Sequence, residues 1–395
     1  MINVAMISPL PAETGAIPES GVSGYAHSLV SHMPPTVAIN LIAQKVVRPM
    51  VEVQGLRLSR SWRPGPHAAM DIVSALRRLD VDLIHLQHEF RLYGGTFPTA
   101  AVVEFLRRDP RIHAPVVTTL HGVVPMSDID EDFLRRYEIP GIPLFARKAI
   151  HIAHRSVRDL SSLTIVHHQY FKEILINDYG FDRSSIEVVL PGTLSKGTLD
   201  EKANFEPSEK TSKAKNVLVF GFLTSYKLPE IVVEVANAMK GEPIHFTFCV
   251  SRNPRATSKA YLERYKSVKK SVLALGEHAT WSGYVRDEEV SQYFDNADLL
   301  VLPYVDCISV SAVASMANAH GVKICFSEPL SPLFPTSNLM FELTVPSLKS
   351  AIANGLDENG PNPIDLPGLV SWNDTASRTI SLWQEILDRR GERSR

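Results

Sequence analysis

The feature that most constrains the fold is a repeated alternation of short apolar runs with amphipathic stretches of helical period. The runs have the length of strands, and Gly or Pro residues bound them. Strands that are apolar on both faces, with helices between them, are typical of a parallel sheet covered on both sides. The runs are residues 3–7, 37–43, 83–86, 116–120, 163–166 and 186–190, followed by 217–220, 246–250, 279–281, 299–303 and 322–326.

A polar segment divides this series in two. Residues 195–215, SKGTLDEKANFEPSEKTSKAK, are charged and poor in apolar side chains. We therefore expect an α/β protein with two doubly wound, Rossmann-like domains, residues 1–195 and 215–370, joined by a linker at 196–214. The final segment, 371–395, contains an amphipathic helix that we expect to pack on the first domain. Between two such domains, a cleft is the expected place for a ligand.

The net charge, the cysteines and the length of the apolar runs limit the partners and the cellular environment that we expect. The net charge of −2 gives no reason to expect nucleic acid as a partner. The cysteines Cys249, Cys307 and Cys325 form no CxxC pair, so we expect a reducing, cytoplasmic environment and no metal framework. No apolar run is long enough to span a bilayer, and the N-terminus lacks the basic flank and cleavage site of a signal peptide.

Polar side chains follow two strands of the first half, where a parallel sheet places its ligand. One strand ends at His121, and a histidine there can contact a sugar hydroxyl or a developing charge. Another ends near His88 and Glu89, with Gly95 in the loop beyond. This second group indicates either an edge that binds sugar hydroxyls or a buried polar network. A zinc site of the HExxH type is excluded, because Phe90-Arg-Leu follows the His-Glu pair.

Glycines precede helices in both halves. Gly21 and Gly24 let backbone N–H groups approach a phosphate or sugar, although a tight turn alone explains them equally well. Gly221 ends a strand, and Lys227 stands near the start of the next helix. An ammonium and the N–H groups of a helix end together suit a diphosphate, with a surface lysine as the alternative.

The loop after the strand 299–303 contains two serines, Ser309 and Ser311, before a helix. Their hydroxyls can bond phosphate oxygens, and a plain helix cap is the alternative.

Taken in order, these blocks resemble the retaining GT-B glycosyltransferases of family 4, over nearly the whole chain. Each motif alone is weak, but their order is specific. The matching stretches are GVSG (21–24), HLQHEF with YGG (85–95), TLH (119–121), LPG (190–192), FGF with YK (220–227), WSGYVRDE (281–288) and DLLVLP (298–303).

The resemblance implies transfer of a sugar from a nucleotide-sugar donor to an acceptor, which can be a glycan, a lipid-linked molecule or a small molecule. It implies neither cofactor nor metal, so the DxD spacing of Asp80-Val-Asp82 and of Asp128-Ile-Asp130 is attributed to chance. His121 is the expected catalytic contact to the transferred sugar. The expected donor-binding residues are Gly221, Lys227, Tyr304, Asp306, Ser309, Val310 and Ser311, and those for acceptor or sugar are Gly21, Gly24, His88, Glu89 and Gly95.

The chain departs from the family pattern at the donor site. Phe222 stands where the family usually has Arg, and Leu228 where it has Gly. The family's two glutamates, eight positions apart, fall on Asp306 and Ala314, and Ala314 cannot bond the donor ribose. An inactive GT-B protein that binds a sugar nucleotide or supports a partner enzyme is therefore the alternative function.

Residues 145–155, FARKAIHIAHR, mix basic and apolar side chains. Such a helix can lie on an anionic lipid surface, and a solvated helix face is the alternative.

Overall fold

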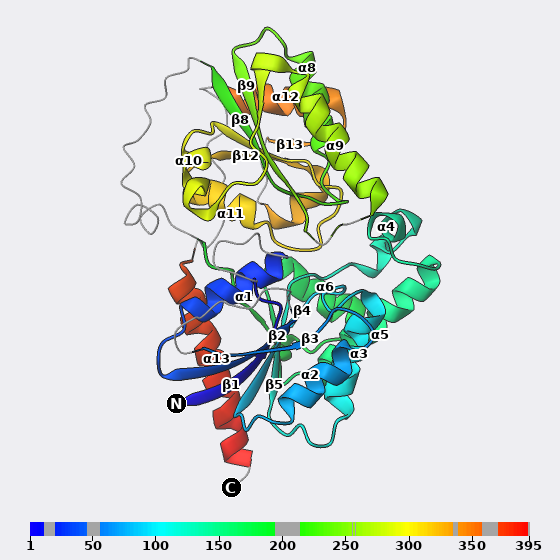
Figure 1. Cartoon of the computed structure of the whole chain (residues 1–395), viewed down its shortest axis with the longest axis vertical. Helices are drawn as coiled ribbons and strands as arrows, with labels where there is room; N and C mark the ends of the chain where they lie inside the picture. The colour runs from blue at the N-terminus through cyan, green and yellow to red at the C-terminus, as the bar shows by residue number, and fades with distance from the viewer. Residues whose placement is uncertain are drawn as a thin grey trace. The chain divides into compact units, whose positions relative to one another are not determined.

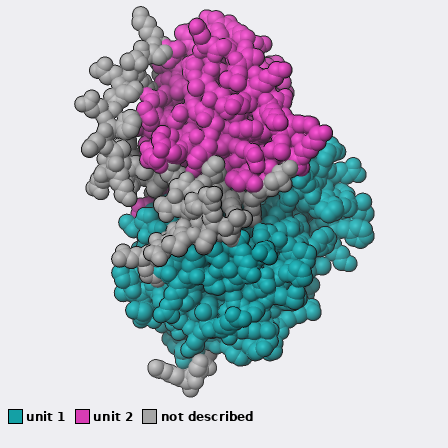
Figure 2. All heavy atoms as spheres, in the orientation of Figure 1, with its two compact units in different colours: residues 1–192, 308–310, 372–395 teal, residues 193–307, 311–371 magenta. Residues whose placement is uncertain are grey.

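The computed structural model describes residues 1–11, 20–45, 56–193, 214–254, 256, 258–334, 339–357 and 370–393. The chain divides into two compact units, coloured in Figure 2: unit 1 is residues 1–192, 308–310 and 372–395, and unit 2 is residues 193–307 and 311–371. Each unit has one parallel sheet with helices on both faces (Figure 1), as expected for an α/β protein of GT-B type. Residues 196–213 of the expected linker lie outside the described residues.

Unit 1 contains a seven-stranded sheet in the order β3-β2-β1-β4-β5-β6-β7, and its registered pairs are all parallel. The chain winds outward from β1 in one direction and then from β4 in the other. Right-handed crossovers therefore place α1 on one face and α2, α3 and α5 on the other. Its elements are β1 (Ile2–Ile7), α1 (Gly21–Ser31), β2 (Val37–Gln44), β3 (Leu56–Trp62), α2 (Ala68–Leu76), β4 (Leu83–His88), α3 (Thr96–Arg108), β5 (Val116–Leu120), α4 (Glu131–Arg136), α5 (Pro143–Leu160), β6 (Leu163–Val166), α6 (Gln169–Tyr179), β7 (Ile186–Val188) and α13 (Trp372–Arg393).

Unit 2 contains a six-stranded sheet in the order β10-β9-β8-β11-β12-β13, also parallel. One of its apolar clusters lies on a single face of the sheet and includes Phe246 and Phe248, which are two positions apart in one strand. Its elements are β8 (Lys215–Leu223), α8 (Pro229–Ala238), β9 (Ile244–Arg252), α9 (Lys259–Leu273), β10 (Ala279–Trp281), α10 (Val290–Asp295), β11 (Leu299–Leu302), α11 (Ala312–Ala319), β12 (Lys323–Ser327), β13 (Met340–Phe341) and α12 (Val345–Leu356). Short 3₁₀ helices occur at Met126–Asp128, Arg183–Ser185, Gly276–His278, Asp287–Glu289 and Glu328–Leu333.

The last helix, α13, belongs to unit 1 and packs against α1. Gly192 permits this contact, because a Cβ at that position would lie 2.5 Å from the Trp372 ring. Thr375 Oγ1 donates a hydrogen bond to the carbonyl of Leu190 at 3.0 Å. The second tryptophan of the helix, Trp383, is fully buried. These contacts explain why a small residue stands at the end of the LPG motif.

Candidate active site

In unit 2, two loops meet where the strand order reverses. β8 is paired with β9 on one side and with β11 on the other, so the loops after β8 and β11 adjoin at the carboxyl edge of the sheet. Lys227 and Tyr304 form an antiparallel bridge between these loops. The Leu228 N–H donates to the Pro303 carbonyl at 2.8 Å. Ligands of doubly wound sheets bind at such switch points, so this pair of loops is the candidate donor site.

Lys227 places a half-buried ammonium at this site. Its Nζ lies 4.9 Å from the centroid of the Tyr304 ring, and both residues line a small hollow. No carboxylate of the described residues forms an ion pair with this Nζ. Burial lowers the pKa of Lys227, and Tyr226 offsets part of that effect. A partly desolvated cation without a counter-charge is suited to bind an anionic group such as a diphosphate.

Gly221 makes room for the ammonium. It lies inside β8, paired with Val250, and not at the end of the strand as the sequence indicated. Its φ of 118° belongs to the region that favours glycine, and an added Cβ would lie 3.0 Å from Lys227 Nζ. Glycine is therefore required here for both backbone conformation and space.

Arg264 holds the loop of Lys227 from α9. Its Nη1 donates to the Thr224 carbonyl at 2.9 Å, and its Nη2 donates to the Lys227 carbonyl at 2.7 Å. The same guanidinium binds both carboxylate oxygens of Glu230, at 2.6 and 2.9 Å. Glu230 lies in the first turn of α8, so one side chain fixes the loop and the following helix together.

The other expected donor residues lie around the start of α11. Ser311 is the N-cap of this helix, and its Oγ accepts a hydrogen bond from the Ala314 N–H at 3.3 Å. Asp306 is half-buried in the preceding loop of unit 2. Ser309 and Val310 are assigned to unit 1, so the structure groups Gly221, Lys227 and Tyr304 without those two.

In unit 1, His121 follows β5 and is part of a chain of hydrogen-bonded side chains. Its Nε2 lies 2.7 Å from Gln87 Oε1, and its Nδ1 lies 3.2 Å from His167 Nε2. His167 Nδ1 lies 2.8 Å from the Val189 carbonyl. The amide nitrogen of Gln87 lies 3.2 Å from His85 Nε2. The chain thus connects the ends of three neighbouring strands.

Each hydrogen bond between these side chains needs one donor and one acceptor, and this requirement determines the tautomers of His121 and His167. The Val189 carbonyl only accepts, so His167 carries its proton on Nδ1, and its Nε2 is an acceptor when the ring is neutral. His121 must then donate from Nδ1 and accept at Nε2. If the amide oxygen of Gln87 faced Nε2, His121 would need a second proton, on Nε2, to make this hydrogen bond. If the NH₂ group of Gln87 faces Nε2 instead, the amide donates and each hydrogen bond has one donor.

Burial favours the neutral arrangement. It lowers the pKa of His121 well below 6.5, with a further contribution from His167. It lowers the pKa of His167 itself to about 4. We therefore assign the amide of Gln87 with its NH₂ group toward His121. The side chains of Gln87 and His167 are buried, while His121 is partly exposed, so His121 is the member that a ligand can reach.

Tyr25 of α1 packs against this chain. Its ring centroid lies 4.7 Å from that of His121 in an edge-on arrangement and 5.3 Å from that of Trp372. Gly21 and Gly24 lie in the first turns of the same helix, and not in a loop before it. The helix starts early because Ser20 and Ser23 form a capping box at its N-terminus.

His88 lies on the other face of the sheet from Gln87, because successive residues of β4 alternate. Its ring is fully buried, 6.3 Å from that of His154, and neither nitrogen has a hydrogen-bond partner among the described residues. Burial lowers its pKa to about 3, with a further contribution from His154. The ring is therefore separated from the chain of His121. Gly95 is the N-cap of α3, with φ 120°, and Glu89 is half-buried next to Gly122.

The sequence alone does not predict two partners of His121 as site residues. Gln87 was visible in the strand-end block, and His167 follows another strand, but neither pattern shows which side chains meet. Among the described residues, no group of three or more metal-ligating side chains gathers, and no described helix is long and apolar enough to cross a membrane.

Comparisons with known proteins agree with this architecture. Residues 22–193 match the model of Glycosyltransferase Family 4. Sucrose-phosphate synthase from Thermosynechococcus elongatus is 14% identical with a TM-score of 0.74, covering 98% of this chain and 100% of that one. HepE of Anabaena, solved with UDP-glucose, is 13% identical with a TM-score of 0.64, covering 99% and 100%. Trehalose-6-phosphate synthase OtsA is 11% identical with a TM-score of 0.68, covering 97% and 99%. No curated protein matches the chain. The chain thus has the fold of GT-B glycosyltransferases.

Proposed function

We propose that this protein with a GT-B fold, whose residues 22–193 match glycosyltransferase family 4, transfers a sugar from a nucleotide-sugar donor to an acceptor with retention of configuration. The observation that carries the proposal is the ammonium of Lys227. It is half-buried at the switch point of the sheet, with no carboxylate of the described residues paired to it. A donor diphosphate would supply the missing counter-charge.

The reaction needs little chemistry from the protein. The acceptor hydroxyl oxygen forms a bond to the anomeric carbon on the face from which the diphosphate leaves, and its proton passes to a phosphate oxygen of the donor. The bond between the anomeric carbon and the diphosphate breaks. Lys227 stabilises the departing charge, and His121 contacts the transferred sugar and orients it. This route uses neither a protein nucleophile nor a metal.

The second candidate is a protein that binds a sugar nucleotide without turning it over. Ala314 favours it, because this position lies in the first turn of α11 with a buried methyl group where the resembling family has a carboxylate. Asp306 remains in the preceding loop, and the proximity of Gly221, Lys227 and Tyr304 supports donor binding. Both candidates bind the donor, so these residues do not separate them. We favour the transferase because the partly exposed His121 is available to contact a transferred sugar.

A panel of sugar nucleotides separates the two candidates. UDP-glucose is the first donor to test, because the HepE structure contains it. Release of free nucleotide that increases with added acceptor supports transfer. Binding by calorimetry without release, across donors and acceptors, supports the second candidate, and binding of no donor overturns both.

The role of His121 is tested by comparing His121→Ala with His88→Ala. Both remove an imidazole from the end of β4 or β5, but His88 is buried on the opposite face. Loss of a buried hydrogen-bonded group costs about 1–3 kcal/mol of folding free energy. Turnover should fall for His121→Ala beyond any effect of unfolding, and should persist in folded His88→Ala. A turnover loss for His121→Ala that thermal unfolding explains entirely would assign His121 to structure alone.

A further inference from the structure

Large exposed hydrophobic side chains of the described residues gather on one layer of unit 1. The described residues have ten such side chains in all, and most of them lie on this layer, whereas soluble proteins usually scatter them singly. The helices α2, α3 and α5 lie next to one another on the same side of the sheet, with α3 packed against both others. Seven of the ten are on these helices or just before α5: Met70, Phe97, Phe105, Ile142, Leu144, Phe145 and Ile152.

The solvent side of α5 combines apolar and basic groups. Phe145, Lys148, Ile152 and Arg155 follow one another at spacings of three and four residues, so they share one side of the helix. All four are exposed, with Phe145 at 61%. The opposite side of the helix is buried against the rest of unit 1. We call the exposed residues of α3 and α5, together with Ile142, the α3/α5 face.

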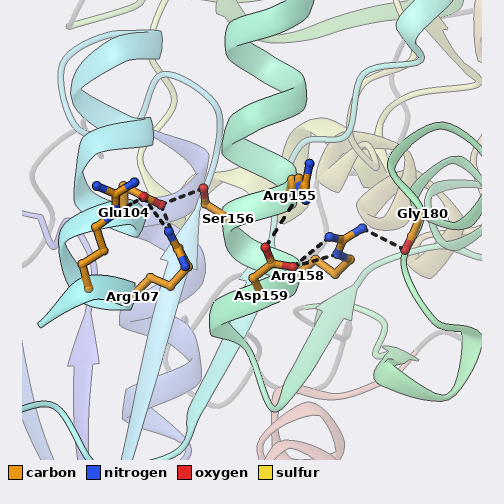
Figure 3. Close-up of polar contacts among 8 residues, drawn as sticks. Glu104, Arg107, Arg155, Ser156, Arg158, Asp159 and Gly180 are labelled. Carbon is orange, nitrogen blue, oxygen red and sulfur yellow. Dashed lines mark hydrogen bonds and ion pairs between the residues drawn. The ribbon is translucent and has the colours of Figure 1, made fainter. Parts of the chain in front are cut away.

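The carboxylates on this face are already paired. Figure 3 shows Ser156 of α5 reaching Glu104 of α3, where its Oγ donates at 3.0 Å. Glu104 also pairs with Arg107 at 2.7 Å and with Arg108. The hydrogen bond from Arg107 holds the pKa of Glu104 at about 2. The second carboxylate, Asp159, pairs with Arg158 at 2.8 Å and, more loosely, with the exposed Arg155 at 3.9 Å (Figure 3). These pairs leave the face with an excess of basic groups.

We propose that the α3/α5 face binds the surface of an anionic lipid bilayer. Aromatic and aliphatic side chains enter the boundary between headgroups and acyl chains, while Lys148 and Arg155 meet lipid phosphates. A second copy of the chain fits less well, because a two-fold contact would place this basic face against itself. The proposal stands on the surface of unit 1 and does not depend on the transferase activity.

Another helix supplies a matched control. α9 of unit 2 is basic on its exposed side, through Lys266, Lys269 and Lys270. Its one large exposed hydrophobic side chain is Leu273. Charge without apolar side chains attracts lipid only weakly, so α9 should contribute little to membrane binding.

The experiment is co-sedimentation of the full chain with vesicles of phosphatidylcholine alone or mixed with phosphatidylglycerol. We expect binding to the mixed vesicles that weakens with salt, and little binding to phosphatidylcholine alone. Lys148→Gln with Arg155→Gln should lower the partition coefficient about 30-fold, given the contribution of each basic residue near such a surface. Phe145→Ser with Ile152→Ser should lower it at least about tenfold. Lys269→Gln with Lys270→Gln should leave it nearly unchanged.

Circular dichroism shows that each variant is folded before it is compared. Absence of wild-type binding to the anionic vesicles overturns the proposal, as does an equal loss in the α9 control. Sedimentation velocity gives an independent check: a wild-type dimer that Phe145→Ser converts to monomer would assign the face to contact between copies and would also overturn it.

Discussion

Replacing Lys227 by methionine should weaken donor binding without weakening the fold. A charge-assisted contact to a phosphate contributes about 1–3 kcal/mol, which corresponds to about 5- to 150-fold in the dissociation constant. Burial lowers the pKa of Lys227 below 10.5, so the fold opposes its charged form. Methionine has a similar length and no charge. The free energy of unfolding should therefore stay the same or rise.

The pH dependence has a defined sign. Between the lowered pKa of Lys227 and 10.5, the unfolded chain binds more protons than the folded chain, so wild-type stability rises with pH in that window. Diphosphate needs the ammonium form, so wild-type affinity should fall as pH rises through the same pKa. Lys227→Met should show neither effect.

The assay is calorimetry with UDP and UDP-glucose, together with chemical denaturation. Lys240→Met is the control, because Lys240 is an exposed lysine just after α8. Unchanged donor affinity in Lys227→Met would refute the assignment, and so would a loss of affinity that accompanies a matching loss of stability.

Other substitutions test the surroundings of the two sites. Gly221→Ala should destabilise unit 2 by about 1–3 kcal/mol through its positive φ and should weaken donor binding by displacing Lys227, measured by denaturation and calorimetry. Arg264→Met should weaken donor binding, measured by calorimetry, because it releases the loop of Lys227. Glu230→Gln should have a smaller effect in the same measurement, because Arg264 can still donate to the backbone carbonyls of that loop. His88→Leu should stabilise the protein, relative to wild type, by about 2 kcal/mol more at pH 5 than at pH 8. Burial holds the pKa of His88 at about 3 in the folded protein, whereas the same histidine in the unfolded chain takes up a proton below about 6.5. Equal stabilisation at both pH values would contradict this account.

The architecture could be predicted from the sequence where strands are buried on both faces. All residues of β5 and β6 are buried, so their apolar runs are continuous and their bounds agree with the expectation. β3 was missed because Leu56–Trp62, at the edge of the sheet, is LRLSRSW and contains no continuous apolar run. β13 has only two residues, too few for a pattern. The pattern therefore detects central strands better than edge strands.

The candidate sites could be predicted only in part. The position of His121 directly after a strand could be predicted, because it is local information, and β5 does end at Leu120. The side chains that contact His121 could not be predicted in this way, because they depend on the alternation of side chains along β4. This alternation places Gln87 on the same face of the sheet as His121 and His88 on the opposite face. Arg264 lies 37 residues from Lys227, so no local pattern connects them. β8 also continues past Phe220 to Leu223, so Gly221 lies inside the strand and not at its end.

Lys227 and His121 are held in place in the same way, and this predicts which substitutions should change ligand affinity. Each partly exposed group is held by groups with defined hydrogen bonds: Arg264 holds the loop of Lys227, and Gln87 and His167 hold the ring of His121. The supporting groups have little freedom to move, because moving them would leave buried polar atoms without partners. A substitution in a support should therefore change ligand affinity while the ligand-facing group stays in place. Activity should thus depend on residues that never touch the ligand.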